Sequence, residues 1–206
     1  MDIHSPFHPE RKLTRDERRL RVVSLCCSFM RNLAFHRAGL RHDVQRRLFN
    51  SSHPRAAFWR EVHVNFLDIC VLDWCKLFAD PKGKHHWQRV IDNHDRFEAD
   101  LYATLSVSVD DFGEMIEKAR RYRNKFVAHL DDERMMHPPI LDVPKKSVAF
   151  LHERLLQRVN LTDAWRLLPT TAAKLEQGYE QAFQEAWSVY DDALRAPLSA
   201  RTASTA

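Results

Sequence analysis

The chain has 206 residues, with 32 Lys and Arg, 28 Asp and Glu and a formal net charge of +4. This length suffices for one compact domain, and only 4 Gly with 44% apolar residues favour helices over a turn-rich β protein. No apolar run approaches the ~20 residues of a membrane span, and the first residues, MDIHSPFHPERK, lack the apolar core of a signal peptide. We therefore expect a cytoplasmic protein without membrane segments.

The charge is unevenly distributed along the chain. Residues 1–60 carry 13 Lys and Arg against 5 Asp and Glu, whereas the remainder carries 19 against 23. A basic N-terminal third can meet a phosphate backbone. The same residues can equally form solvated helix faces, as in RDERRLR, and the sequence leaves both interpretations open.

The first helical segment is predicted over residues 14–39. Thr14 is followed three positions later by Glu17, which resembles a capping box, and apolar residues recur after it at helical spacing. A continuation is expected over 40–49. Cys26 and Cys27 in this segment, like Cys70 and Cys75 in the next, lack disulfide or CxxC spacing, so we expect buried free thiols.

The second helix is predicted over 56–78, after a break at NSSHP in which Ser52 or His53 is the expected cap. It is the most apolar segment, so we expect it at the centre of the bundle. It should end at ADPKGK, where proline and glycine favour a turn. Its aromatic residues are expected in the core rather than on a base-stacking surface, namely Phe58, Phe66, Trp74 and Phe78.

The third helix is predicted over 85–105, with His86 as cap and Trp87 packed against the bundle. Ser108 or Asp110 should cap a fourth helix over 111–130.

Further helices are expected over 148–161 and 170–195. The interpretation is an all-α, single-domain bundle of five to six helices spanning 14–195. A flexible N-terminus (1–13) and a disordered tail (196–206) are expected to flank it.

The motif RYRNKFVAHL, residues 121–130, places Arg123 and Asn124 five to six residues before His129. Arg-to-His spacing of this kind recurs along the chain and is not specific by itself. Requiring Asn directly after Arg leaves two matches, this one and RNLAFH, which begins at Arg31 in the first predicted helix.

The segment RYRNKFVAHLDDE resembles the signature of the HEPN superfamily, and FLDICVLDWCKLFADPKGKHHWQRV is similar to its abortive-infection-type branch. The similarity covers roughly residues 15–195. It implies an all-α bundle that dimerises around the motif helix and, in active members, cleaves RNA without metal. It assigns Arg123, Asn124 and His129 to the motif and discounts RNLAFH, which lies in the wrong helix. A toxin or phage-defence role, with an antitoxin or nucleotidyltransferase partner, follows from the same resemblance.

The motif residues themselves indicate how such a site would work. In an α-helix, Arg123 and His129 lie about 120° apart, so one helix holds them on either side of a ridge. A second copy of the helix would close a shared cleft, which is why we expect a homodimer. His129 would transfer protons, Arg123 would bind the phosphate and Asn124 would orient substrate or His129.

Four more basic residues would supply a positive field for single-stranded RNA, namely Lys118, Arg120, Arg121 and Lys125. No metal constellation or phosphate-binding loop is visible, so no metal or cofactor is expected. The alternative is that His129 is a core histidine near a helix C-terminus and Arg123 an ion-pair partner. The chain would then be a non-catalytic HEPN-like module that binds a partner protein, a nucleotide or RNA.

Overall fold

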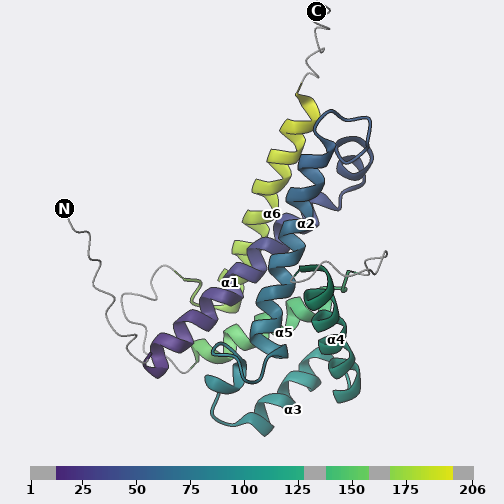
Figure 1. The fold of residues 1–206 in the computed structure, drawn as a ribbon. Coiled ribbons are helices and arrows are strands. Elements are labelled where there is room, and N and C mark those ends of the chain that lie inside the picture. Colours follow the sequence, from purple (N-terminus) through teal and green to yellow (C-terminus); the bar gives the residue numbers. More distant parts are fainter. Residues whose placement is uncertain (1–12, 128–137, 158–167, 197–206) are drawn as a thin grey trace, which may run out of the picture.

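The computed structural model describes residues 13–127, 138–157 and 168–196, and these residues form helices and connections without a strand (Figure 1). The long helices are α1 (Arg15–Gly39), α2 (Ala56–Trp74), α3 (His94–Leu105), α4 (Val109–Tyr122), α5 (Asp142–Leu156) and α6 (Ala172–Arg195). The expectation of an all-α bundle is confirmed. The predicted N-terminal arm, the end of the predicted fifth helix and most of the tail lie outside the described residues.

Two predicted helix starts are confirmed by their caps. Thr14 accepts a hydrogen bond from the backbone N–H of Glu17, whose carboxylate accepts one from the backbone N–H of Thr14. Ser108 and Asp111 make the same reciprocal pair at the start of α4. Each pair satisfies backbone donors that a helix N-terminus leaves free.

The predicted start of the second helix at residue 56 is confirmed, but the expected cap is wrong, because α2 begins without a side-chain cap. The side chain of Asn50 binds Ser52, and His53 Nδ1 accepts a hydrogen bond from the N–H of Arg55, within the preceding turn.

The predicted start of the third helix is wrong. Helix α3 begins only at His94, since Asn93 accepts a hydrogen bond from the N–H of Arg96 and caps it. The residues before it form only a short 3-10 turn (Trp87–Arg89).

His86 caps that 3-10 turn, as predicted, by accepting a hydrogen bond from the N–H of Gln88. Helix α5 starts six residues before the predicted start at Val148. It accommodates Pro144 in its first turn, where a proline removes no helical hydrogen bond.

Three segments have π-helical rather than α-helical geometry. They are η1 (Val44–Leu48), η2 (Cys75–Ala79) and η4 (Arg123–Val127). The last two directly continue α2 and α4, so each of these helices widens at its C-terminal end. Such widened turns occur frequently at functional sites.

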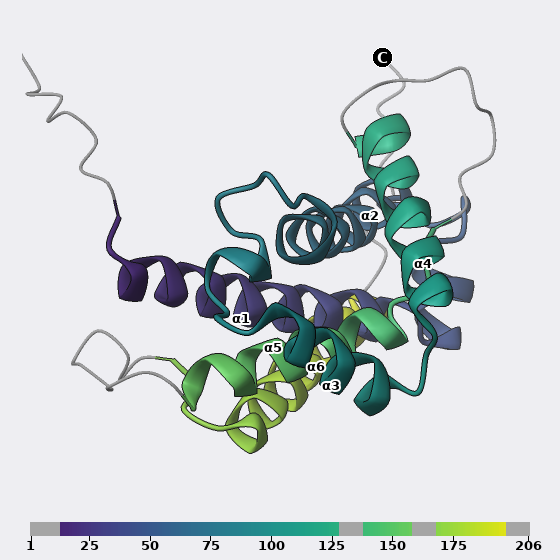
Figure 2. The ribbon, with the colours of Figure 1, turned by 90° about the horizontal axis from the view of Figure 1, so that it is seen from below.

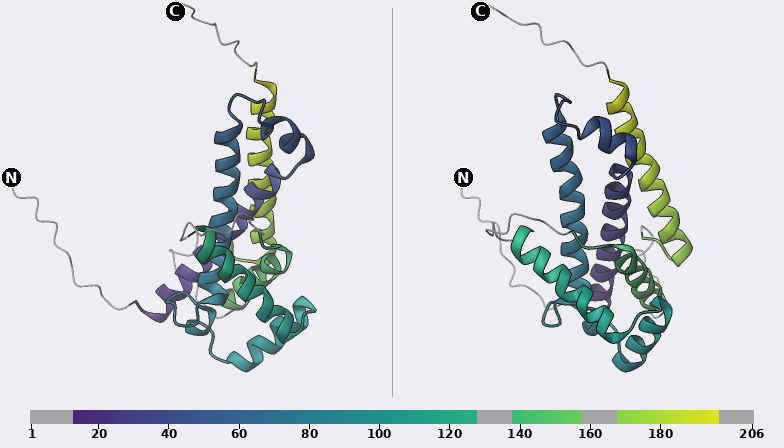
Figure 3. Two further views of the ribbon diagram at one scale, coloured as in Figure 1. Left: turned by 45° about the vertical axis from the view of Figure 1, so that its right-hand side comes forward. Right: turned by 90° about the vertical axis from the view of Figure 1, so that its right-hand side faces the viewer.

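The arrangement is a bundle of long helices with shorter ones gathered at one end (Figures 1 and 3). Helix α1 packs against α2, α5 and α6. Seen along α2, α4 stands beside it, and α3, α5 and α6 lie below (Figure 2). The placement of α4 beside the end of α2 positions the motif.

The buried apolar residues form two clusters of different size. The larger one contains residues of all five helices from α1 through α5 and of the start of α6. The side chains of Trp74, Phe29 and Leu151 lie within it. The smaller cluster lies at the other end of the bundle and consists of Ala38, Val44, Leu48, Phe49, Ala186 and Tyr190.

The cysteines are free thiols as predicted, and three of the four are buried. Of the aromatic residues expected in the core, Trp74 and Phe78 are buried, Phe66 is half-buried and Phe58 is 60% exposed. The assignment of Phe58 to the core is therefore wrong, because its position on α2 faces outward. Within the described ranges, no helix combines the length and apolar character needed to cross a membrane.

Candidate functional site

The basic side chains of α4 meet the C-terminal end of η2. The guanidinium of Arg120 donates from Nε to the carbonyl oxygen of Ala79 at 2.9 Å, and its second contact to that oxygen comes from Nη2. The same guanidinium pairs with Glu117 at 2.6 Å. Because the last carbonyls of a helix lack partners, Arg120 closes the end of η2 and its charge is balanced locally.

Arg123 lies one turn further along and is also engaged within the chain. Its Nη1 is 2.6 Å from the Oδ2 of Asp80, and its Nε donates to the Oδ1 of Asn124 at 3.1 Å. The hydrogen bond to Asp80 raises the pKa of Arg123, so the guanidinium stays charged. Asn124 is exposed and directly contacts Arg123. The sequence did not indicate Asp80 as a partner of Arg123.

Helix α4 is fixed against α2 by a hydrogen bond next to the motif. The hydroxyl of Tyr122, which is 1% exposed, donates to the Oδ1 of Asp68 at 2.7 Å. Burial raises the pKa of Asp68, and the hydrogen bond from Tyr122 partly offsets this rise. This pair sets the rotation of α4 and hence the direction in which Arg123 leaves the helix.

The angle expected between Arg123 and His129 assumed α-helical geometry throughout, and only the stretch from Arg123 to Val127 is described. The helix is π-helical from Arg123 to Val127, where hydrogen bonds join residues five apart and each residue rotates less about the axis. His129 itself lies outside the described residues. The expected division of the two groups across a ridge therefore stays a prediction.

Two of the four residues of the predicted positive field are paired with carboxylates. Lys118 pairs with Glu114 at 3.1 Å, and Arg120 is neutralised as described above. Arg121 is exposed and makes no ion pair within the described residues, and Lys125 is half-buried. Of the four residues expected to attract RNA, Arg121 presents its charge most freely to solvent.

The rival match RNLAFH has a different environment. Arg31 is exposed on α1, whereas His36 stacks on His63 with ring centroids 4.4 Å apart. Burial lowers the pKa of His36 and brings that of His63 to about 4. His36 therefore packs between helices as a neutral ring, which agrees with discounting this match.

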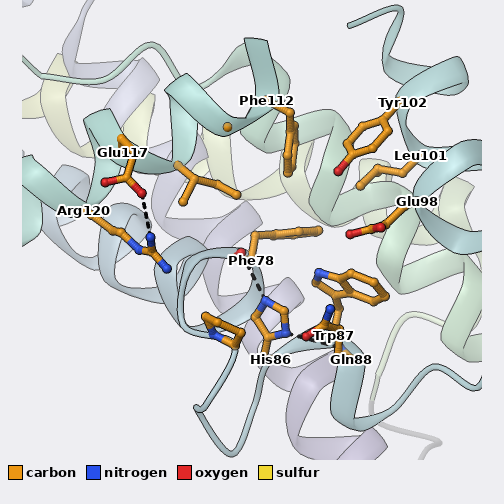
Figure 4. A pocket seen from close by; sticks show the side chains of 13 residues that line it. Phe78, His86, Trp87, Gln88, Glu98, Leu101, Tyr102, Phe112, Glu117 and Arg120 are labelled. Carbon is orange, nitrogen blue, oxygen red and sulfur yellow. Dashed lines mark hydrogen bonds and ion pairs between the residues drawn. The ribbon is translucent and has the colours of Figure 1, made fainter. Parts of the chain in front are cut away.

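A pocket of about 420 Å³ lies beside Arg120 (Figure 4). The sequence did not predict it. Its walls come from the end of α2, the following loop, α3 and α4, and they contain the aromatic residues Phe78, Trp87, Tyr102 and Phe112. The only sequence signal was the i, i+4 pair of Glu98 and Tyr102 on α3. The sequence assigned Phe78 and Trp87 to packing alone.

In the part of the chain that the structure describes, no group of three or more His, Cys, Asp or Glu residues is placed to hold a metal ion. The site consists of Arg123 and Asn124 at the start of η4, their partner Asp80 and the adjoining pocket. No protein-family model, curated protein or solved structure matches the chain. Its function has to be inferred from the residues and their geometry.

Proposed function

We propose that the chain is a metal-independent endoribonuclease that acts as a homodimer, with Arg123, Asn124 and His129 at the interface. The proposal follows the resemblance of the motif to HEPN proteins. The structural observation that supports it most directly is the change from α4 to η4 at Arg123, where the side chains of Arg123 and Asn124 are in contact. Widened turns of this type are frequent at functional sites.

The roles follow from the chemistry of the side chains. Arg123 keeps its charge and has donors beyond those bound to Asp80 and Asn124, so it can bind a phosphate oxygen. His129 would move the proton of the ribose 2′-hydroxyl, because imidazole titrates near neutrality. A second copy would bring a second His129 and complete an acid–base pair. A toxin or defence role remains part of the proposal.

The test is cleavage of single-stranded RNA with a chelator present. The wild-type chain should cut RNA and leave DNA of the same sequence intact, since DNA lacks the 2′-hydroxyl nucleophile. His129→Ala should lower the rate on the order of 10²–10⁴-fold, the usual contribution of positioned acid–base catalysis. Arg31→Ala is the matched control, because Arg31 is exposed in the rival match, and it should cleave like wild type. Cleavage that needs magnesium, or that survives in His129→Ala, would exclude the proposal.

The alternative is a non-catalytic module that binds a partner protein, a nucleotide or RNA. The ion pair of Arg123 with Asp80 favours it, because this pair gives Arg123 a structural role without any substrate.

Asp80→Asn separates the two functions, because it removes the charge of the partner and leaves Arg123 in place. If Arg123 binds phosphate, Asp80→Asn should retain cleavage while Arg123→Ala loses it. If both variants lose cleavage and stability equally, Arg123 serves only to pair with Asp80.

A further inference from the structure

The pocket beside Arg120 has the walls of a site for a flat ring. Phe78 and Phe112 meet with ring centroids 6.0 Å apart at 79°, and Tyr102 adjoins Phe112 at 5.6 Å. Together they make an aromatic corner, and Trp87 lies across from it (Figure 4). A volume of about 420 Å³ falls within the range typical of small-molecule sites.

Several polar groups face this space without a partner among the described residues. The carboxylate of Glu98 and the hydroxyl of Tyr102 point toward the aromatic corner (Figure 4) and, within the described residues, neither makes a hydrogen bond or ion pair. The same holds for the indole N–H of Trp87. Convergent, uncommitted polar groups on apolar walls are characteristic of ligand sites.

The charges around the pocket leave Glu98 unbalanced. Glu117 is paired with Arg120. His86 is neutral, because its Nδ1 accepts a hydrogen bond from Gln88 N–H and its Nε2 donates to the Phe78 carbonyl, and burial lowers its pKa. Burial together with the charge of Glu98 raises the pKa of Tyr102, so the phenol stays protonated. The pocket therefore favours a ligand that donates N–H groups to a carboxylate.

We propose that this pocket binds a guanine base, with Glu98 accepting its N1–H and N2–H bonds. Guanine is the one common base whose pairing edge offers two adjacent donors; the other bases turn a ring nitrogen or a carbonyl toward the carboxylate. A carboxylate accepts two parallel donors with good geometry. The aromatic rings supply contact with the face of the base, and the indole N–H of Trp87 supplies a donor for O6.

The pocket lies next to the proposed phosphate site. Arg120 borders the pocket, and Arg123 follows three residues later on the same helix, a rise of about 4.5 Å. A base in the pocket and its phosphate at Arg123 can thus belong to one nucleotide. The inference rests on the proposed function only in naming RNA as the source of the guanine.

The test is calorimetric titration of the full chain with guanosine, inosine and adenosine. Guanosine should bind, inosine about tenfold more weakly because it lacks the N2 amine and one charge-assisted hydrogen bond, and adenosine more weakly still. Glu98→Gln should remove the preference for guanosine over inosine. Glu180→Gln, an exposed carboxylate on α6, is the matched control and should bind like wild type.

A second variant blocks the pocket without disturbing the fold. A Cβ added at Gly113 meets nothing within 4 Å, and Gly113 lines the pocket, so Gly113→Leu should fill it and abolish guanosine binding. Gly178→Leu on α6 is its control, because Gly178 has equally open surroundings. Both changes favour helix, so loss of folding is not the expected cause of a negative result.

The outcomes separate this inference from the proposed function. Equal affinity for guanosine and inosine, no guanosine binding, or unchanged binding in Gly113→Leu would overturn the guanine pocket. RNA cleavage without preference for guanosine sites would overturn it too, while leaving the nuclease intact. Guanosine binding by Glu98 in a chain that never cleaves RNA would support the pocket and contradict the nuclease.

Discussion

Two arginines of the motif helix, Arg120 and Arg123, bind the C-terminal end of η2 and the residue after it. The sequence indicated Arg123 and Asn124 as candidate residues, because they stand together in the motif. It did not indicate Ala79 or Asp80 as partners, because they lie more than 40 positions earlier and meet α4 only in the folded chain. The sequence thus identified candidate groups, whereas the fold decided which charges are balanced.

At the same scale, His152 should make stability depend on pH. It is 0% exposed on α5, and burial lowers its pKa from 6.5 to about 4, although the Pro169 carbonyl partly opposes this. Among the described residues, neither ring nitrogen has a hydrogen-bond partner of good geometry. The unfolded chain therefore takes up the proton first as the pH falls, and the folded state loses stability between pH 6.5 and 4.

The measurement is the free energy of unfolding in urea at pH 7 and pH 5. The shift of His152 should lower it by about 2 kcal/mol at pH 5, and the similarly shifted His63 adds to the loss. His152→Leu should reduce this pH dependence, whereas the same change at the exposed His42 should not. An equal slope in His152→Leu would show that the buried imidazole is not its source.

At the scale of elements, capping residues and apolar spacing predicted most helices, because both signals are local. Thr14 and Ser108 therefore gave correct starts. The π-helical segments and the late start of α3 were missed. We attribute the π-helical segments to packing against other helices and the late start of α3 to competition between nearby caps. No local sequence pattern indicates either of them. The same reason applies to the pocket, whose walls come from four segments.

At Gly39, near the end of α1, helices α2 and α6 approach the backbone closely. A Cβ there would overlap Nδ1 of His63 and lie 3.0 Å from the hydroxyl of Tyr190. Gly39→Ala should therefore lower the free energy of unfolding by about 1–3 kcal/mol, because α2 or α6 must shift. Gly178→Ala should instead raise it by up to about 1 kcal/mol, since its surroundings are open and alanine favours helix. Urea denaturation of both variants measures the difference, and equal effects would exclude a close contact at Gly39.

At the scale of the whole molecule, one side of α2 carries two exposed apolar side chains, with the exposed Asn65 between them. Phe58 is 60% and Ile69 is 38% exposed, and about three turns separate them, so they lie on one side of the helix. Segment η4 also packs against α2. The second copy required by the proposed site can cover this face while bringing the two motif helices together.

Ile69→Lys tests this arrangement, because a charge at this position opposes the burial of the face. Light scattering of the wild-type chain should give about twice the chain mass of 24.3 kDa, and Ile69→Lys should shift it toward one chain. Val189→Lys on α6, where Val189 is 51% exposed, should leave the dimer intact. A wild-type monomer at high micromolar concentration, or a dimer that tolerates Ile69→Lys, would contradict the proposed interface.

The two clusters of buried residues differ in how firmly they hold the helices. The smaller one, around Phe49 and Tyr190, joins the C-terminal parts of α1 and α6 to η1. The larger one lies beneath the motif, where Trp74 and Tyr122 are almost fully enclosed. Since local opening costs least where few apolar groups must be exposed, we expect the end of the bundle around Phe49 and Tyr190 to open first. Such opening would leave the packing of Trp74 and Tyr122 beneath the candidate site in place.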